Sequence, residues 1–182
     1  MNRETKKISI PIITTTALMA AIIFVVTYLI RIPLPFASGG YLNIGDAPIY
    51  LGAYILGGPA GAFAAALGSA LSDLVGGYVF YALPTAIIKG TMGLVAGILL
   101  ARNKSLLRFV VASVIGGGIM VTGYAIFEAL FFNLNQAIAT IPFNSVQWVG
   151  GVLVASALYP AIKPIEHALF AGERRKKPSS ST

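Results

Sequence analysis

The chain has 182 residues, of which 57% are hydrophobic and only 10% are charged, and its formal net charge is +7. Soluble globular domains carry about 25% charged residues, so this composition indicates a membrane protein. The sequence has no cysteine and one histidine, His167, which excludes disulfides and thiolate chemistry. We therefore expect no metal site and no cofactor.

Apolar segments long enough to cross a bilayer begin near the N-terminus. A spanning helix needs about 20 apolar residues, and the first predicted span covers residues 11–30. It is longer than the apolar region of a signal peptide, so we interpret it as retained. The prolines and glycines of residues 31–46 stop this helix. The next helix, residues 47–56, is half-length and must be shielded by its neighbours, because backbone amides in lipid have to be satisfied internally.

Four further helices follow in the remaining chain, over residues 60–75, 83–101, 107–132 and 143–162. The segments predict an all-α polytopic membrane protein, a six-transmembrane-helix bundle over residues 11–162. We expect residues 1–182 to form a single membrane domain. A soluble helical protein is the alternative, but a chain of this length could not bury five apolar runs of near-membrane length.

The basic residues predict the orientation of the bundle. Eleven of the 13 lysines and arginines lie before the first span, between the fourth and fifth, or after the sixth. Six spans put these regions on one side, and the positive-inside rule makes that side cytoplasmic. Both termini are then cytoplasmic, with an N-terminal segment over residues 1–10 and a basic tail over residues 163–182. The absence of a basic stripe interleaved with aromatic residues argues against a nucleic-acid partner.

Small residues recur at helical spacing in three of the predicted spans. Gly61 and Gly68 in the third span, and Gly93 and Gly97 in the fourth, let helix backbones approach closely in lipid. We expect these to pack inside the bundle. Ala17 and Ala21 lie four residues apart in the first span, and composition leaves open whether their partner is internal or external.

Three ionisable residues interrupt the apolar spans near one end. A charge in the bilayer costs about 2.5 kcal/mol or more, so it usually pairs or lines a cavity. Asp73 ends the third span, Lys89 lies about 9 Å below the outer end of the fourth, and Glu128 lies one turn below the outer end of the fifth. The same outer half contains Tyr41, Asn43, Asp46, Thr85, Tyr124, Asn144, Gln147 and Trp148. This one-sided polarity predicts a pocket for a small molecule.

Other interpretations of these residues remain open. Lys89 could bridge Asp73 or Glu128 as a structural ion pair, the amides could cap helix ends, and Trp148 could be an interfacial anchor. The sequence contains no phosphate-binding loop, G-x-S-x-G or H-E-x-x-H motif, so no catalytic residue is assigned. An intramembrane enzyme using Asp73 and Glu128 is a further alternative.

Two stretches carry a resemblance to a known family: "GYLNIGDAPIYLGAYILGGPAGAFAAALGSALSDLVGGY" and "PTAIIKGTMGLVAG". Over residues 10–165 the chain resembles the substrate-binding S components of energy-coupling factor (ECF) vitamin transporters, in the branch for hydroxymethylpyrimidine, pyridoxine and riboflavin. The resemblance implies an outward pocket closed by the first loop. Asp46 would end this lid and, like Asp73, lie near enough to water to stay ionised. Ala17 and Ala21 would form the docking face for the coupling subunit.

The resemblance also implies a function. The protein would capture a small water-soluble vitamin or precursor from outside and rotate within the membrane. A transmembrane coupling subunit and two cytosolic ATPases would drive this ABC importer, so the chain itself would not be an enzyme. It would be a multi-pass protein of a prokaryotic plasma membrane. We favour hydroxymethylpyrimidine or pyridoxine as substrate, with riboflavin next. A structural membrane partner without a ligand is the alternative.

Overall fold

The computed structural model describes residues 9–33 and 41–175, with side chains up to Phe170. These residues form six helices and one two-stranded hairpin, which confirms the predicted all-α polytopic class. Four segments are long and apolar enough to cross a membrane: α1 (Ile10–Leu29), α4 (Val79–Leu100), α5 (Leu106–Phe131) and the part Leu134–Phe170 of α6 (Leu134–Arg175).

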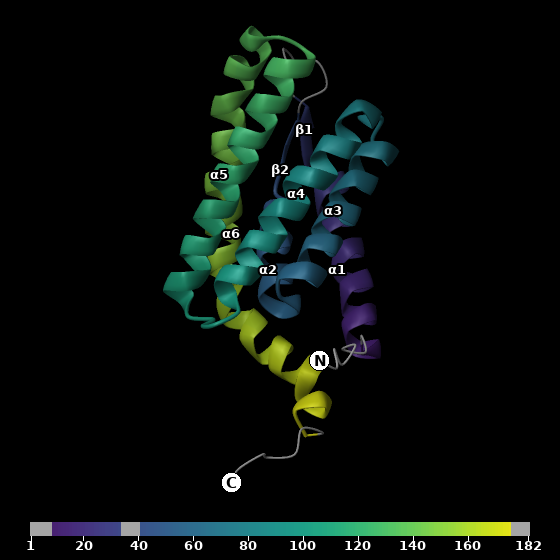
Figure 1. Ribbon diagram of the computed structural model, residues 1–182, viewed down its shortest axis with the longest axis vertical. Coiled ribbons are helices and arrows are strands. Elements are labelled where there is room, and N and C mark those ends of the chain that lie inside the picture. The colour runs from purple at the N-terminus through teal and green to yellow at the C-terminus, as the bar shows by residue number, and fades with distance from the viewer. Residues whose placement is uncertain (1–8, 34–40, 176–182) are drawn as a thin grey trace, which may run out of the picture.

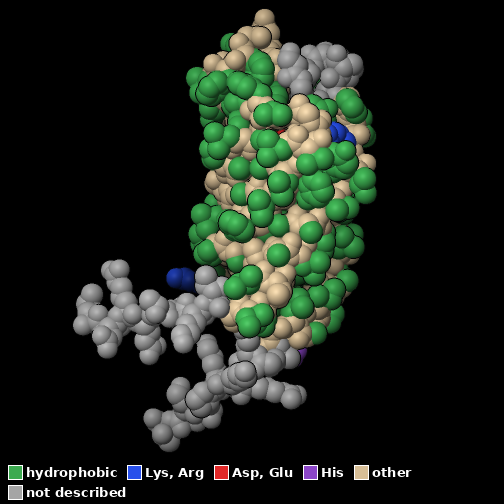
Figure 2. Space-filling view, turned by 90° about the vertical axis from the view of Figure 1, so that its right-hand side faces the viewer, with side chains coloured by type: hydrophobic (Ala, Val, Ile, Leu, Met, Phe, Trp, Pro, Cys, Tyr) green, Lys and Arg blue, Asp and Glu red, His purple; other side chains and the backbone are tan. Residues whose placement is uncertain are grey.

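The helices form an elongated bundle in which the start of α1 and the end of α6 lie at the same end (Figure 1). Helix α3 (Gly58–Val75) packs against α1 and α4, and α5 packs against α4 and α6. Hydrophobic side chains dominate the side of the bundle, where few charged ones appear (Figure 2). Such a surface suits contact with lipid rather than water.

The short helix α2 (Asp46–Leu56) lies in the middle of the bundle. It contacts the five other helices, and every residue from Asp46 to Ile55 is buried. The prediction that neighbouring helices shield this half-length helix is therefore confirmed. Gly57 turns the chain into α3 with φ of 78°, a conformation that glycine adopts without the steric cost of a side chain.

Small residues bring α3 and α4 into close contact. A Cβ atom on Gly93 would lie 2.9 Å from the carbonyl oxygen of Gly61, and one on Gly97 would collide with the backbone of Gly58. Gly68 of α3 faces α1 in the same way, against Ile23. The glycines of the third and fourth spans are thus internal packing positions, as predicted.

The segment between α1 and α2 contains a hairpin that the sequence did not predict. Strand β1 (Arg31–Pro33) pairs antiparallel with β2 (Tyr41–Asn43), and Arg31 lies opposite Asn43. Three residues per strand are too few to show a period of two. The tip of the predicted lid, residues 34–40, lies outside the described residues, as do the predicted cytoplasmic residues 1–8 and 176–182.

Two helices begin at least four residues earlier than predicted, whereas the other four begin within two residues of the predicted start. Helix α4 starts at Val79 rather than residue 83, and α6 starts at Leu134 rather than residue 143 and continues to Arg175. Helix α6 contains Pro142, Pro160 and Pro164. Proline is tolerated in membrane helices where neighbouring groups satisfy the freed carbonyls. Residues 134–142, expected to be loop, therefore belong to a helix that faces the bundle.

Candidate functional site

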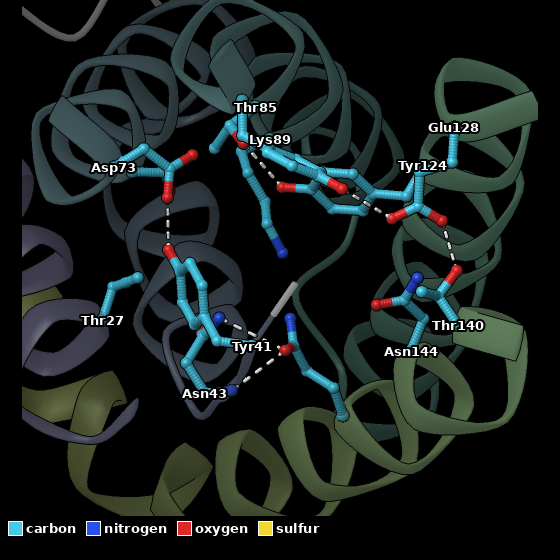
Figure 3. A pocket seen from close by; sticks show the side chains of 13 residues that line it. Thr27, Tyr41, Asn43, Asp73, Thr85, Lys89, Tyr124, Glu128, Thr140 and Asn144 are labelled. Atoms are coloured by element: carbon cyan, nitrogen blue, oxygen red, sulfur yellow. Dashed lines mark hydrogen bonds between the residues drawn. The ribbon is translucent and has the colours of Figure 1, made fainter. Parts of the chain in front are cut away.

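A polar cavity of about 40 Å³ lies in the half of the bundle opposite the start of α1 and the end of α6. The β2 strand and helices α1, α3, α4, α5 and α6 contribute its walls (Figure 3). Every lining residue is polar or ionisable: Thr27, Tyr41, Asn43, Ser69, Asp73, Tyr81, Thr85, Lys89, Tyr124, Glu128, Thr140, Asn144 and Gln147.

The structure brings together most of the residues singled out from the sequence. Nine of them line the cavity: Tyr41, Asn43, Asp73, Thr85, Lys89, Tyr124, Glu128, Asn144 and Gln147. Asp46 and Trp148 do not. Sequence reasoning missed four wall residues, Thr27, Ser69, Tyr81 and Thr140. Thr27 and Ser69 carry lone hydroxyls, which are ordinary in apolar helices and give no signal. Tyr81 and Thr140 precede the predicted starts of the fourth and sixth spans, so the correct helix starts would have placed them in the bundle.

Asp73 is held by a tyrosine of the hairpin. The Tyr41 hydroxyl donates a hydrogen bond of 2.5 Å to Asp73 Oδ1, and Asp73 is only 1% exposed. The prediction that Asp73 lies near water is therefore wrong, because α3 turns this carboxylate into the bundle. Burial is the main cause that raises the pKa of the Tyr41 hydroxyl, and the nearby Asp73 charge raises it further. Tyr41 thus stays a neutral donor.

Arg31 fastens the hairpin to the end of α3 from the other side. Its Nη2 atom donates to the Ser72 carbonyl oxygen at 3.2 Å and to Ser72 Oγ at 3.1 Å. The guanidinium lies 4.6–5.1 Å from three aromatic ring centroids, within range of cation–π attraction. The rings belong to Tyr28, Tyr41 and Tyr78. The hairpin is therefore bonded to α3 both at the cavity wall and outside it.

Lys89 of the cavity wall forms an ion pair with Asp46, which does not line the cavity. Asp46 is fully buried, and Lys89 is 3% exposed. The amine of Lys89 points toward the centre of the surrounding side chains (Figure 3). Asp46 begins α2 inside the bundle instead of ending a loop near water, so that prediction is wrong. The structural bridge considered between Lys89 and Asp73 or Glu128 is not present either, since the partner is Asp46.

Gln147 connects this ion pair to the hairpin. Its Nε2 atom donates to Asp46 Oδ2 at 3.1 Å, and its Oε1 atom accepts from Asn43 through the backbone N–H at 3.0 Å and Nδ2 at 3.2 Å. The hydrogen bond from Gln147 to the Asp46 carboxylate is charge-assisted, so it partly offsets the cost of burying the pair. Strand β2 and helices α2, α4 and α6 thus share one polar network.

Glu128 has a separate set of partners. Tyr81 donates to its Oε1 atom at 3.2 Å, Thr140 donates to its Oε2 atom, and Gln136 in turn donates to the Tyr81 hydroxyl at 3.2 Å. The hydroxyls of Thr85 and Tyr124 lie 2.9 Å apart nearby. In the described part of the chain, neither Glu128 nor Asp73 forms an ion pair. The cavity wall therefore has an excess of carboxylate acceptors.

Trp148 lies outside this network although Gln147 precedes it. Successive residues of a helix point about 100° apart, and α6 directs the indole toward α5, where a Cβ atom on Gly117 would collide with it. The indole is partly buried against the hydrophobic core. Trp148 is thus a packing residue here.

The arrangement supplies many hydrogen-bonding groups for a small polar ligand. Carboxylates accept, hydroxyls and amides do both, and Lys89 donates. Within residues 9–33 and 41–170, no group of three or more His, Asp or Glu side chains could hold a metal ion. The groups that line the cavity are hydrogen-bond donors and acceptors.

Comparison with known proteins finds similarity over nearly the whole chain. The sequence model of the family "ECF-type riboflavin transporter, S component" matches residues 7–164. The thiamine precursor transporter HmpT of Lactococcus lactis subsp. cremoris (strain MG1363) is 32% identical over 162 residues, which cover 89% of this chain and 90% of the relative. A Pyrococcus woesei protein described as an uncharacterized protein in the gap 3′ region is 40% identical over 134 residues, 74% of this chain and 89% of its own.

Proposed function

The chain belongs to the family of S components of ECF-type riboflavin transporters, and from this premise we propose that its polar cavity captures a small vitamin or vitamin precursor. The observation that carries the proposal is the convergence of nine polar residues, selected from sequence alone, on one buried cavity. Polar side chains in membrane helices are costly, so they usually pair with one another or line a functional cavity.

The favoured substrate is hydroxymethylpyrimidine or pyridoxine, with riboflavin as the alternative. Asp73 and Glu128 are acceptors that suit the amino group or hydroxyls of a single ring. The cavity volume of about 40 Å³ is far below the roughly 300–1,000 Å³ of sites for larger ligands. A one-ring compound therefore requires less widening than a three-ring flavin. The name of the Lactococcus relative, a thiamine precursor transporter, also supports this choice.

Energy for uptake would come from partner proteins: a transmembrane coupling subunit and two cytosolic ATPases. The docking face would include Ala17 and Ala21, both exposed on α1, whereas Met19, Ala20 and Ile23 are buried in the bundle. The clustered basic residues support cytoplasmic termini in a prokaryotic plasma membrane, with the cavity toward the outside.

A thermal-shift panel in detergent tests the substrate. Hydroxymethylpyrimidine or pyridoxine should raise the melting temperature by mass action, because a hundredfold excess over Kd stabilises the folded state by about 2.7 kcal/mol. Glu128→Gln should weaken this shift, and Glu166→Gln, which changes a carboxylate at the opposite end of the bundle, is the matched control.

If no vitamin or precursor stabilises the protein, a structural membrane partner becomes the better interpretation. Turnover of a ligand without ATPases, abolished by Asp73→Asn, would indicate an enzyme instead.

Ala17→Leu tests the docking face. The larger side chain should prevent close helix approach, so uptake in cells should fall while ligand binding by the purified protein persists. Ala139→Leu places the same bulk on an exposed position of α6 and should leave uptake unchanged. Normal uptake by the Ala17 variant would remove the docking assignment.

A further inference from the structure

A second cavity, of about 700 Å³, lies at the opposite end of the molecule from the polar cavity. It is bounded by the end of α2, the turn between α4 and α5, and the last part of α6. Its lining residues are Tyr54, Ala101, Arg102, Asn103, Lys104, Lys163, Pro164, Glu166 and His167. Three lysine or arginine side chains and one carboxylate thus face a common hollow.

The wall of this second cavity is held together by specific contacts. Lys104 Nζ forms an ion pair of 3.2 Å with Glu166 Oε1, and it lies 4.9 Å from the centroid of the Tyr54 ring. The Tyr159 hydroxyl donates a hydrogen bond of 2.6 Å to the Lys104 carbonyl oxygen. These contacts join the α4–α5 turn to α2 and α6. They also neutralise Glu166, the one carboxylate on the wall, with Lys104.

Two cations of the second cavity remain available to a ligand. Arg102 and Lys163 are exposed and, within the described part of the chain, form no ion pair or side-chain hydrogen bond. They come from the α4–α5 turn and from α6, segments more than 60 positions apart in the sequence. Arginine offers a planar fork of donors that matches phosphate oxygens. This pair of cations therefore favours a phosphate-bearing ligand.

Exposed apolar side chains occur on the same two segments of the chain as these cations. Leu107, Ile165 and Leu169 are 76%, 48% and 40% exposed, near the start of α5 and on the last part of α6. Helix α6 has 42 residues, a length of about 63 Å, which exceeds the roughly 30 Å of the hydrocarbon core. Its last part bends across the end of the bundle (Figure 1). The second cavity thus lies where the spans end, at the level expected for lipid head groups.

We propose that the second cavity binds the phosphate of an anionic phospholipid. Arg102 and Lys163 contact the phosphate oxygens, and the acyl chains extend into the hydrocarbon core along the apolar side of the bundle (Figure 2). A free phosphate would gain nothing from the nearby hydrocarbon core, which is why a lipid is the favoured source. Basic pockets at the ends of membrane helices are suited to lipid head groups. The positive-inside rule requires only an excess of basic residues on one side, not their convergence on one cavity.

Native mass spectrometry of the purified full chain, titrated with phosphatidylglycerol or phosphatidylcholine, tests this proposal. Phosphatidylglycerol should bind more tightly. Arg102→Gln and Lys163→Gln should each weaken its binding about fivefold. Arg108→Gln is the matched control, because it removes a charge from the same end of the bundle but from a residue that does not line the second cavity.

Three outcomes would overturn the lipid assignment. Equal weakening by Arg108→Gln would indicate diffuse surface charge, and equal binding of both lipids would indicate no head-group site. Displacement of phosphatidylglycerol by millimolar inorganic phosphate would indicate a site for a free anion. Vitamin-induced thermal shifts in the same variants report separately on the polar cavity, so failure here is distinguishable from failure of the proposed function.

Discussion

The two ends of the bundle use charged residues in opposite ways. At the end with the hairpin, Asp46, Asp73, Lys89 and Glu128 are each at most 3% exposed, and protein groups bond to all four. At the other end the side chains of Lys104 and Glu166 are 32% and 14% exposed. Buried charges depend on their protein partners, because water cannot replace them, whereas exposed pairs are solvated and screened. Loss of a partner should therefore matter more at the first end.

At the second end, close packing of rings and glycines adds to the polar contacts of Lys104. The rings of Tyr54, Phe109 and Tyr159 lie with centroids 5.2–6.0 Å apart, a distance range at which aromatic pairs are favourable. Gly58 and Gly97 meet nearby between α3 and α4. Substitutions should thus distinguish the ends: one is sensitive to the loss of polar partners, and the other to added volume.

Lys89→Met should have the largest effect on stability. It leaves the Asp46 carboxylate buried without its cation, and breaking such a pair costs about 3–5 kcal/mol. Reversible unfolding in mixed micelles measures the change. The double variant Lys89→Met with Asp46→Asn should recover much of the loss, because no uncompensated charge remains. A loss below about 1 kcal/mol in the single variant would contradict the dependence on partners.

Gly97→Ala should destabilise the protein by about 1–3 kcal/mol, the usual cost of overpacking. The added Cβ atom would collide with the Gly58 backbone, which cannot move aside without separating α3 from α4. Gly118→Ala is the matched control, since a Cβ atom there meets nothing within 4 Å. That variant should be neutral or up to about 1 kcal/mol more stable, through helix propensity. Equal effects would refute a volume-sensitive contact.

Tyr41→Phe should cost about 1–1.5 kcal/mol of unfolding free energy, because Asp73 loses a hydrogen-bond donor. The ring and its packing against Tyr78 remain. Tyr78→Phe removes a hydroxyl that forms no hydrogen bond in the described structure and should change stability by less than about 0.5 kcal/mol. Chemical denaturation of both variants compares them directly. Similar values would mean that the hairpin is held by packing alone.

Lys104→Gln should have the smallest effect on stability, about 0–1 kcal/mol. Its ion pair with Glu166 is partly exposed, so water can solvate the carboxylate that remains. The same unfolding assay, at low and at moderate salt, tests this expectation, because salt screens an exposed pair. A loss comparable to that of Lys89→Met would erase the distinction between the two ends.

Much of the candidate cavity wall was predictable because polar residues are rare in apolar helices. Asp73, Lys89 and Glu128 were conspicuous for that reason, and the amides followed from their position in the chain. The partner of Lys89 was not predictable. Asp46 is 43 positions away, and its approach depends on where α2 starts and how that helix is rotated.

The membrane-protein class, the shielded half-length helix and the glycine contacts followed from the amino-acid sequence, because lipid imposes apolar runs and close helix approach requires small residues. The burial of Asp46 against Lys89, the packing of Trp148 on α5 and the completion of the wall by Thr27, Ser69, Tyr81 and Thr140 depended on how the helices pack together. The spacing of residues limits which ones share a helix face, but the packing of neighbouring helices sets the direction in which that face points.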